Sequence, residues 1–247
     1  MSLLEVDNLH VAYGQSQALF GVSLEVSRGE LVSLVGRNGV GKSTTMRGIM
    51  GLNAPNKGIV RWKGKDISGR DPYLNCRDGI GYIPEDRRIF YDLSVWENLD
   101  VARNRNAVPG SPSGLSSESS VGIQWNEEKV FDLFPELAEL RHRKGGVLSG
   151  GQQQMLTIAR SLMGNPELLL LDEPSEGLAP LVVSRMREGV ALLKEAGLSI
   201  VLAEQNLDFV LSLSDRIYVL EKGQVKYAGS AEDLKNNIDV QKQYLTV

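Results

Sequence analysis

The sequence is short of cysteine, of basic charge and of long apolar runs, and each shortage excludes a class of protein. Cys76 is the only cysteine among 247 residues, so no intramolecular disulfide can form and a reducing compartment is expected. A net charge of −4 and a pI near 5.4 argue against a dedicated nucleic-acid-binding protein. No apolar run approaches the roughly 18 residues that cross a bilayer, and the N-terminus lacks the features of a signal peptide. We therefore expect a cytoplasmic protein that reaches a membrane only through a partner.

The order of the apolar segments predicts an α/β fold in a single domain of residues 1–247. Val22, Leu24 and Val26 alternate with polar residues, so β structure is expected near the N-terminus. From Ser149 onward, expected helices and strands alternate, which indicates a sheet with parallel strands. The expected helices are 44–50, 94–102, 126–134, 150–163, 181–195 and 206–213, and the expected strands are 30–35, 58–62, 80–83, 168–172, 199–203 and 216–221. Residues 109–122, rich in proline, glycine and serine, are expected to form a flexible surface loop.

The segment from Gly36 to Ser43 carries the strongest chemical signal. It reads G-x-x-x-x-G-K-S between an apolar strand and a helical segment, which is the setting that a phosphate-binding loop needs. Glycines let backbone N–H groups converge on phosphate oxygens, and the start of a helix adds partial positive charge. Lys42 can reach the outer phosphates, and the Ser43 hydroxyl can bind Mg²⁺. The sequence therefore predicts a nucleoside triphosphate site.

A second element of such a site is the apolar run 168–171, which ends in Asp172 and Glu173. In a phosphate-loop fold this strand lies beside the loop, and its terminal aspartate holds Mg²⁺ directly or through water. A carboxylate one residue further on can polarise the attacking water. By itself the run is a weak signal, but together with the phosphate loop it predicts hydrolysis of the triphosphate.

The pentapeptide at 148–152 reads L-S-G-G-Q and identifies a family. With the phosphate loop before it and the Asp-Glu pair after it, the chain resembles the ATP-binding cassette (ABC) ATPases from Tyr13 to about Gly229. In that family the signature of one chain caps the nucleotide that a second chain holds. Ser149 and the backbone N–H groups after it open a helix, which offers the γ-phosphate a second anion-binding site.

The resemblance implies an architecture and a set of partners. We expect a phosphate-loop α/β core with an N-terminal antiparallel β subdomain, residues 1–87 and 161–247, and an inserted α-helical subdomain, residues 88–160. The expected partners are a second ABC ATPase subunit, either a paralogue or another copy, and two membrane permease subunits. A periplasmic or extracellular solute-binding protein would take part indirectly. The protein is then expected to lie on the cytoplasmic face of the inner (plasma) membrane, with its partner-contacting surface around residues 82–100.

The same resemblance assigns roles to residues. Glu173 is expected to be the catalytic base, with Gln205 and Glu85 acting beside it. The expected Mg²⁺ ligands are Ser43, Asp172 and Glu85. The residues expected to bind ATP are Tyr13, which would stack on adenine, and Gly36, Arg37, Asn38, Gly39, Gly41, Lys42, Ser43, Thr44, Ser149, Gly150, Gly151 and Gln152.

Three positions depart from the commonest pattern of the family. Glu85 stands where many cassettes have glutamine, Gln205 stands where histidine is usual, and Ala179 stands where aspartate is frequent. Gln205 can donate a hydrogen bond to the γ-phosphate but cannot carry the charge of a histidinium. Together these departures resemble the ATPases of importers for branched-chain amino acids and related solutes, including urea and aromatic acids. This chain resembles the shorter of the two ATPase subunits that pair in such importers.

Other classes of cassette protein are alternatives. An ATPase of DNA repair or chromosome structure would place a long coiled coil between the phosphate loop and the signature, but only about a hundred residues without heptads lie between them here. A ribosome-binding tandem cassette would need two phosphate loops, and an export or signalling cassette would usually keep glutamine at 85 and histidine at 205. The transported solute does not follow from this sequence, because solute choice belongs to other subunits.

Overall fold

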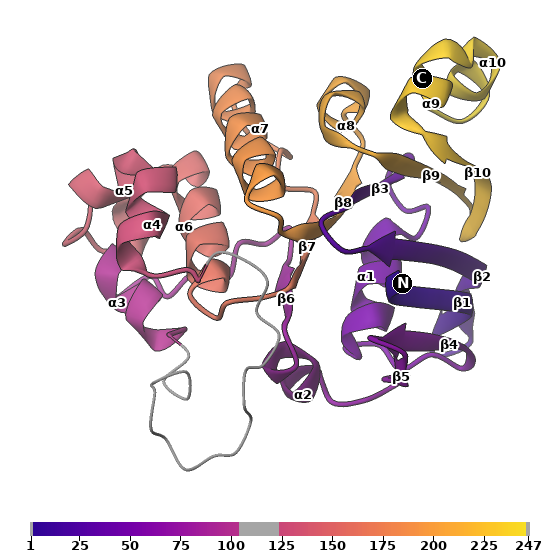
Figure 1. Ribbon diagram of the computed structural model, residues 1–247, viewed down its shortest axis with the longest axis horizontal. Coiled ribbons are helices and arrows are strands. Elements are labelled where there is room, and N and C mark those ends of the chain that lie inside the picture. Colours follow the sequence, from indigo (N-terminus) through magenta and orange to yellow (C-terminus); the bar gives the residue numbers. More distant parts are fainter. Residues whose placement is uncertain (1, 104–123, 246–247) are drawn as a thin grey trace.

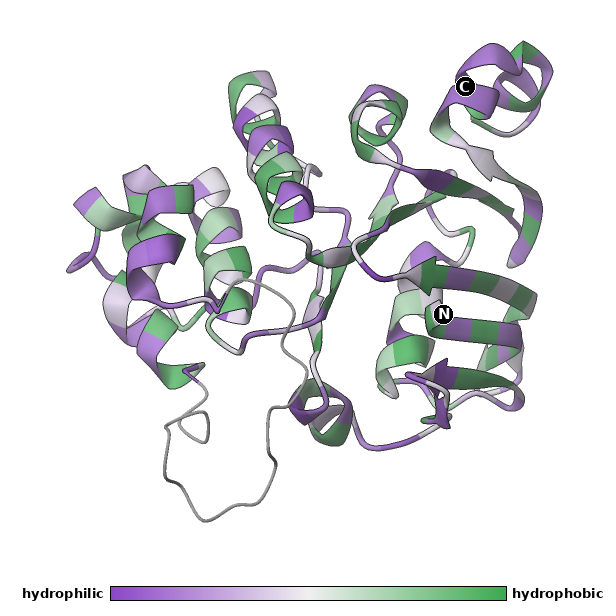
Figure 2. Cartoon of the chain, viewed as in Figure 1, coloured by the Kyte–Doolittle hydropathy of each residue, from purple (hydrophilic) through white to green (hydrophobic). Residues whose placement is uncertain are grey.

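Two β-sheets organise the computed structural model, which describes residues 2–103 and 124–245 (Figure 1). The smaller sheet is antiparallel with the order β2-β1-β4-β5. Its strands are β1 Ser2–Tyr13, β2 Ser16–Ser27, β4 Lys57–Trp62 and β5 Lys65–Asp66. Side chains along β1 and β2 alternate between buried and exposed over much of their length, and Figure 2 shows this as alternating hydrophobic and hydrophilic bands. This pattern lets one face of the sheet pack on the core while the other faces water.

The larger sheet has the order β10-β9-β3-β8-β7-β6. Its strands are β3 Leu31–Val35, β6 Ile80–Ile83, β7 Leu168–Asp172, β8 Ser199–Glu204, β9 Arg216–Glu221 and β10 Gln224–Ser230. The strands from β9 to β6 run parallel, as predicted, and β10 pairs antiparallel with β9 at one edge. Every residue of β3, β7 and β8 is buried, which explains why their sequences are mostly apolar.

The longer helices lie where the sequence predicted them, with ends shifted by at most two residues. They are α1 Lys42–Met50, α3 Val95–Val101, α4 Glu127–Leu133, α6 Gly150–Leu162, α7 Pro180–Glu195 and α8 Leu207–Leu213. The sequence did not predict the short helices α2 Pro72–Arg77, α5 Pro135–Glu139, α9 Ala231–Asn236 and α10 Ile238–Val240, the 3₁₀ turn Gly145–Val147 or the π-helical turn Gln241–Leu245. These segments are too short to show a helical period of apolar residues.

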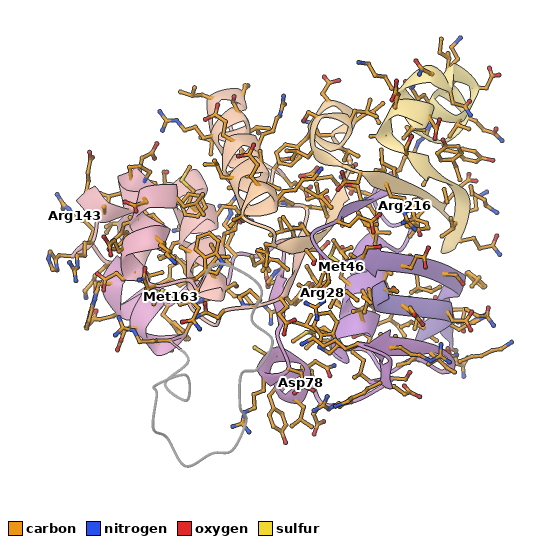
Figure 3. The ribbon with its side chains drawn as sticks, viewed as in Figure 1. Arg28, Met46, Asp78, Arg143, Met163 and Arg216 are labelled. Carbon is orange, nitrogen blue, oxygen red and sulfur yellow. The ribbon has the colours of Figure 1, made fainter. Side chains whose placement is uncertain are left out.

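Two large apolar clusters hold these elements together. In one, Met46 of α1 packs between the smaller sheet and one face of the larger sheet. In the other, Met163, directly after α6, packs with α3, α4, α5, α7 and the opposite face of the larger sheet. Figure 3 labels both methionines, in the right and left halves of the molecule respectively. The α/β fold with an added antiparallel sheet is therefore confirmed.

Within the described ranges, no helix combines the length and the apolar character that crossing a bilayer requires. The expected surface loop at 109–122 lies outside the described residues. The division into core and helical subdomains stays a prediction, although α3, α4, α5 and α6 do gather on one side of the molecule (Figure 1).

Candidate nucleotide-binding and hydrolysis site

The phosphate loop leaves the carboxyl end of β3 and enters α1. Gly39 and Gly41 have φ values of 78° and 112°, a left-handed conformation that favours glycine. A Cβ atom at Gly41 would also lie only 2.6 Å from Leu19 Cδ2, so the turn leaves no room for a side chain. The loop therefore presents backbone rather than side chains where it meets the start of α1, as a phosphate cradle requires.

Lys42 bridges the phosphate loop and the end of β7. Its Nζ atom donates hydrogen bonds to the carbonyl oxygens of Gly36, at 2.7 Å, and Arg37, at 3.0 Å. The same atom lies 3.1 Å from Oε1 of Glu173, and the two side chains are only 2% and 7% exposed. This buried ion pair brings the predicted phosphate clamp and the predicted catalytic base into contact.

Asp172 is held by two hydroxyl groups. The Ser43 hydroxyl donates to Oδ1 at 2.9 Å, and the Tyr82 hydroxyl donates to Oδ2 at 3.0 Å. Burial raises the pKa of the Asp172 carboxyl despite these two hydrogen bonds. A divalent cation beside Asp172 would offset that cost, and hydroxyl and carboxylate oxygens are ligands that Mg²⁺ accepts. Ser43 and Asp172 therefore fit the metal that the sequence predicts.

Glu173 has a left-handed backbone with φ of 46°, which is uncommon for a residue with a side chain. Its N–H group donates to the Ala203 carbonyl at 2.9 Å, and its Oε2 atom accepts a 3.0 Å hydrogen bond from Gln205 Nε2. Burial alone would raise the pKa of Glu173, but hydrogen bonding to Glu176 and the charge of Lys42 hold it below its ordinary value. The side chain is thus set to act as a carboxylate, the form that a general base needs.

Gln205 also reaches the phosphate loop, because its Nε2 atom donates to Oδ1 of Asn38. The loop residue Asn38, the base Glu173 and the switch position Gln205, far apart in sequence, therefore meet at one point. This juxtaposition is what the predicted roles of Gln205 and Glu173 require.

The sequence did not single out Glu176, which joins the same group of carboxyls. A hydrogen bond with Glu173, partial burial, and the charges of Glu173 and Glu85 raise the pKa of Glu176 to about 7. Glu85 is exposed, and it interacts with this group of carboxyls through Glu176. Its predicted role as a metal ligand stays a prediction.

Tyr13 ends β1 beside the start of α1. Its ring is about half exposed, at 48%, and its hydroxyl lies 3.4 Å from Oγ1 of Thr44. Interaction with the nearby Tyr82 hydroxyl, and to a smaller extent with that of Tyr13, raises the pKa of the Arg47 guanidinium. An exposed ring next to the phosphate loop is available for stacking, so the predicted adenine contact stays open.

The signature lies elsewhere in the molecule. Ser149 caps α6: its Oγ accepts from Gln152 N at 3.3 Å, while Gln152 Oε1 accepts from Ser149 N at 2.9 Å. Ser149 is exposed, and in Figure 1 α6 and α1 lie on opposite sides of β6 and β7. The structure therefore does not bring the signature residues 149–152 together with this chain's phosphate loop at 36–44.

The segment after Glu85 is fastened to α6. The Thr157 hydroxyl donates to the Arg87 carbonyl at 2.6 Å, and Arg160 Nη2 donates to the Arg88 carbonyl at 2.6 Å. The Arg160 guanidinium lies 5.0 Å from the centre of the Phe90 ring, a ring that is 48% exposed. The predicted partner-contacting segment thus packs against α6, the helix that begins at the signature.

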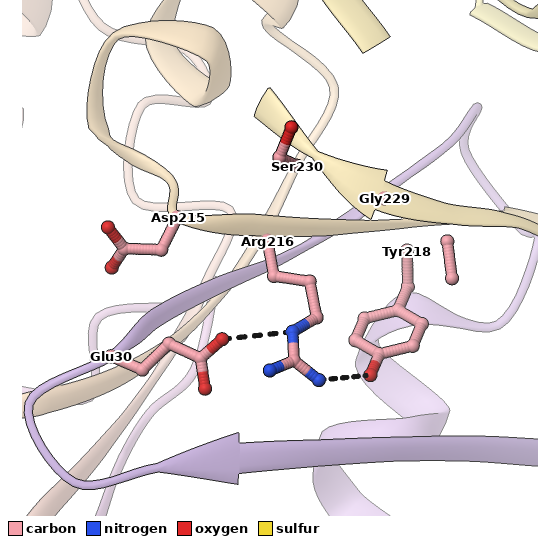
Figure 4. Close-up of a pocket in the computed structure, with 7 residues that line it drawn as sticks. Glu30, Asp215, Arg216, Tyr218, Gly229 and Ser230 are labelled. Atoms are coloured by element: carbon pink, nitrogen blue, oxygen red, sulfur yellow. Dashed lines mark hydrogen bonds and ion pairs between the residues drawn. The ribbon is translucent and has the colours of Figure 1, made fainter. Parts of the chain in front are cut away.

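A pocket of about 450 Å³ lies at the amino end of β9, next to Arg216, the first residue of that strand (Figure 4). Because β9 runs parallel to β3, this is the amino end of the strands, whereas the phosphate loop follows their carboxyl end. Within the pocket Arg216 pairs with Glu30 at 3.0 Å and donates to the Tyr218 hydroxyl at 3.5 Å. These charged groups already have partners, so the pocket does not compete with the phosphate loop as the reactive site.

Comparisons with known proteins agree with this geometry. The family model described as ABC transporter matches residues 19–176. The branched-chain amino acid transport ATP-binding protein BraG of Pseudomonas aeruginosa is 39% identical over 243 residues, which cover 98% of this chain and 99% of that protein. The lipopolysaccharide export ATP-binding protein LptB of Haemophilus influenzae is 32% identical, covering 99% of this chain and 98% of that protein.

A solved structure has the same architecture. It is the ADP conformation of MJ1267, an ATP-binding cassette of an ABC transporter. Its sequence is 32% identical to this one, the TM-score is 0.79, and the match covers 98% of this chain and 96% of that one.

Proposed function

Because this chain belongs to the ABC transporter family and is an ATPase that couples hydrolysis to transport, we propose that it is an ATPase subunit of an importer for branched-chain amino acids or a related small solute. The observation that carries the ATPase part of this proposal is the meeting of Lys42, Glu173, Gln205 and Asn38 beside the Ser43–Asp172 pair. The similarity to BraG supports the amino-acid importer. The similarity to LptB makes the direction of transport the point to test.

In this proposal the residues of the chain divide the work on ATP. Lys42 leaves the carbonyls of Gly36 and Arg37 to pair with phosphate oxygens, while the backbone of the loop surrounds them. Ser43 and Asp172 would hold Mg²⁺, which would supply positive charge to neutralise the phosphates. Glu173, released from Lys42, orients and deprotonates the attacking water. Gln205 keeps a neutral hydrogen-bond donor next to Glu173 and the γ-phosphate position.

We further propose that the site works only between two chains. The start of α6, where the exposed Ser149 is the cap, presents the positive end of the helix to a nucleotide on a second ATPase subunit. ATP then favours the closed pair, because its phosphates are shared by both halves, and hydrolysis removes that preference. Permease subunits would contact the segment around Phe90 and Tyr91, both exposed, and would hold the protein on the cytoplasmic face of the membrane.

The test is transport by the assembled complex. The chain is co-purified with the membrane subunits and the second ATPase encoded beside its gene and placed in proteoliposomes with the cognate solute-binding protein. We expect ATP-dependent accumulation of radiolabelled leucine, suppressed by unlabelled valine and absent with Glu173→Gln. Accumulation of radiolabelled urea or of a radiolabelled aromatic acid, in place of leucine, would reassign the solute, and ATP hydrolysis without uptake of any of these solutes would contradict the importer.

A further inference from the structure

Glu204, the last residue of β8, is a buried carboxylate with no role in the account so far. Glu204 is only 2% exposed. Oε1 accepts a hydrogen bond from Ser175 N at 2.9 Å, and Oε2 accepts from Gln205 N at 3.0 Å and from Asn206 N at 3.3 Å. Three backbone N–H groups therefore surround the carboxylate, which is how a protein offsets the cost of burying charge.

The three N–H groups belong to two different parts of the site. Ser175 lies two residues after Glu173, in the loop that leaves β7, while Gln205 and Asn206 form the turn that leaves β8 and starts α8. The strands β7 and β8 are neighbours, and the Glu173 N–H to Ala203 carbonyl bond continues their pairing by one step. Beyond that bond, the Glu204 carboxylate joins the two diverging segments.

We propose that Glu204 is a positioning residue for the hydrolysis site: it fixes the turn that carries Gln205 against the loop that carries Glu173. This inference rests on the proposed function of the site. The Gln205 side chain reaches Glu173 Oε2 at 3.0 Å and Asn38 at the same time, and both contacts depend on where its backbone sits. A shift of the turn would move the amide away from the base and from the γ-phosphate position together, while leaving the phosphate loop in place.

Glu204→Gln isolates this effect, because it keeps the shape of the side chain. A glutamine has one acceptor oxygen and one NH₂ group, so its NH₂ must face either Ser175 N–H or the N–H groups of Gln205 and Asn206. A donor then faces a donor, and one side of the link between the two segments is lost. Glu204→Asp keeps the charge on a shorter side chain and serves as a second variant if the glutamine variant does not fold.

The experiment is a double-mutant cycle on the full-length chain, comparing wild type, Glu204→Gln, Gln205→Ala and the double variant. Steady-state ATP hydrolysis gives kcat and KM, and thermal melting checks folding. If Glu204 acts through Gln205, Glu204→Gln lowers kcat about tenfold with KM changed less than about twofold, and has little further effect once Gln205 is alanine. Glu221→Gln, which changes a carboxylate at the end of β9, a strand of the same sheet separated from β8 by β3, is the matched control and should match wild type.

An equal loss of kcat from Glu204→Gln in both backgrounds would overturn the inference, because it would mean a general structural role. Unchanged kcat in a folded Glu204→Gln variant would overturn it as well. Glu173→Gln, measured alongside, separates this outcome from failure of the proposed function. An inactive Glu173→Gln beside an unaffected Glu204→Gln removes only the positioning role, whereas a fully active Glu173→Gln removes the assigned catalytic site.

Discussion

Replacing Glu173 by glutamine should separate nucleotide binding from hydrolysis. Without nucleotide, Glu173 pairs with the buried Lys42 at 3.1 Å and accepts a hydrogen bond from Gln205. Glutamine keeps the size of the side chain and an oxygen that can accept from Lys42. It removes the negative charge that holds Lys42 and the basicity that would activate water.

Both effects can be given a magnitude. Loss of a general base lowers turnover by about 10² to 10⁴, or about 3–5 kcal/mol in barrier height. The Lys42 and Glu173 side chains are only 2% and 7% exposed, so solvent screens their ion pair little. A hydrogen bond between charged groups stabilises by about 1–2 kcal/mol more than one to a neutral group. Lys42 must leave Glu173 to reach phosphate, so the glutamine variant should bind ATP about five- to thirtyfold more tightly.

Three measurements make up the assay. Phosphate release measures ATP hydrolysis, calorimetry measures ATP binding, and light scattering measures the mass of the particle in solution. We expect almost no release, tighter binding and an ATP-dependent doubling of mass, while Glu195→Gln, an exposed carboxylate at the end of α7, behaves as wild type. Turnover by Glu173→Gln within about threefold of wild type would refute the assignment of the base.

Three further changes test other parts of the site. Gln205→His should leave the turnover of the assembled complex unchanged or raise it, because an imidazolium adds charge near the γ-phosphate; a loss of tenfold or more, about 1.4 kcal/mol, would show that the glutamine is required. Gly151→Ala should lower both the melting temperature and ATP-dependent pairing, since its Cβ would lie 2.4 Å from Val182 Cγ1, and wild-type values for both would disprove that steric reasoning. The pKa of Glu176 is about 7 in the folded protein, against an ordinary 4.5. Between these values the folded protein holds a proton that the unfolded chain releases. The free energy of unfolding is therefore highest at low pH and falls as the pH rises through 7. Melting of nucleotide-free wild type should therefore fall more between about pH 5 and pH 8 than that of Glu176→Gln, and parallel curves would contradict it.

The sequence predicted the parts of the fold and site that depend on local pattern. The mostly apolar strands 168–172 and 199–203 and the amphipathic segment 150–163 were placed to within one residue at each end. The antiparallel edge strand β10 was missed because its half-exposed residues lack a strong apolar signal.

The residues that the sequence did not reveal act across neighbouring strands. Tyr82 reaches Asp172 because β6 pairs with β7, and Glu204 reaches Ser175 because β7 pairs with β8. Strand order cannot be read from a single sequence, so these side chains carried no signal.

The central claim is that one chain holds only half of a catalytic pocket and that a second chain supplies the rest. Mixing two inactive variants tests it most directly. Lys42→Ala removes the lysine that binds the phosphates, and Ser149→Arg blocks the signature. If two copies of this chain pair at random, an equimolar mixture should regain about a quarter of wild-type ATP hydrolysis, since half of the pairs would contain one intact composite site. Full turnover by Ser149→Arg alone, at protein concentrations where it is monomeric, would contradict the claim.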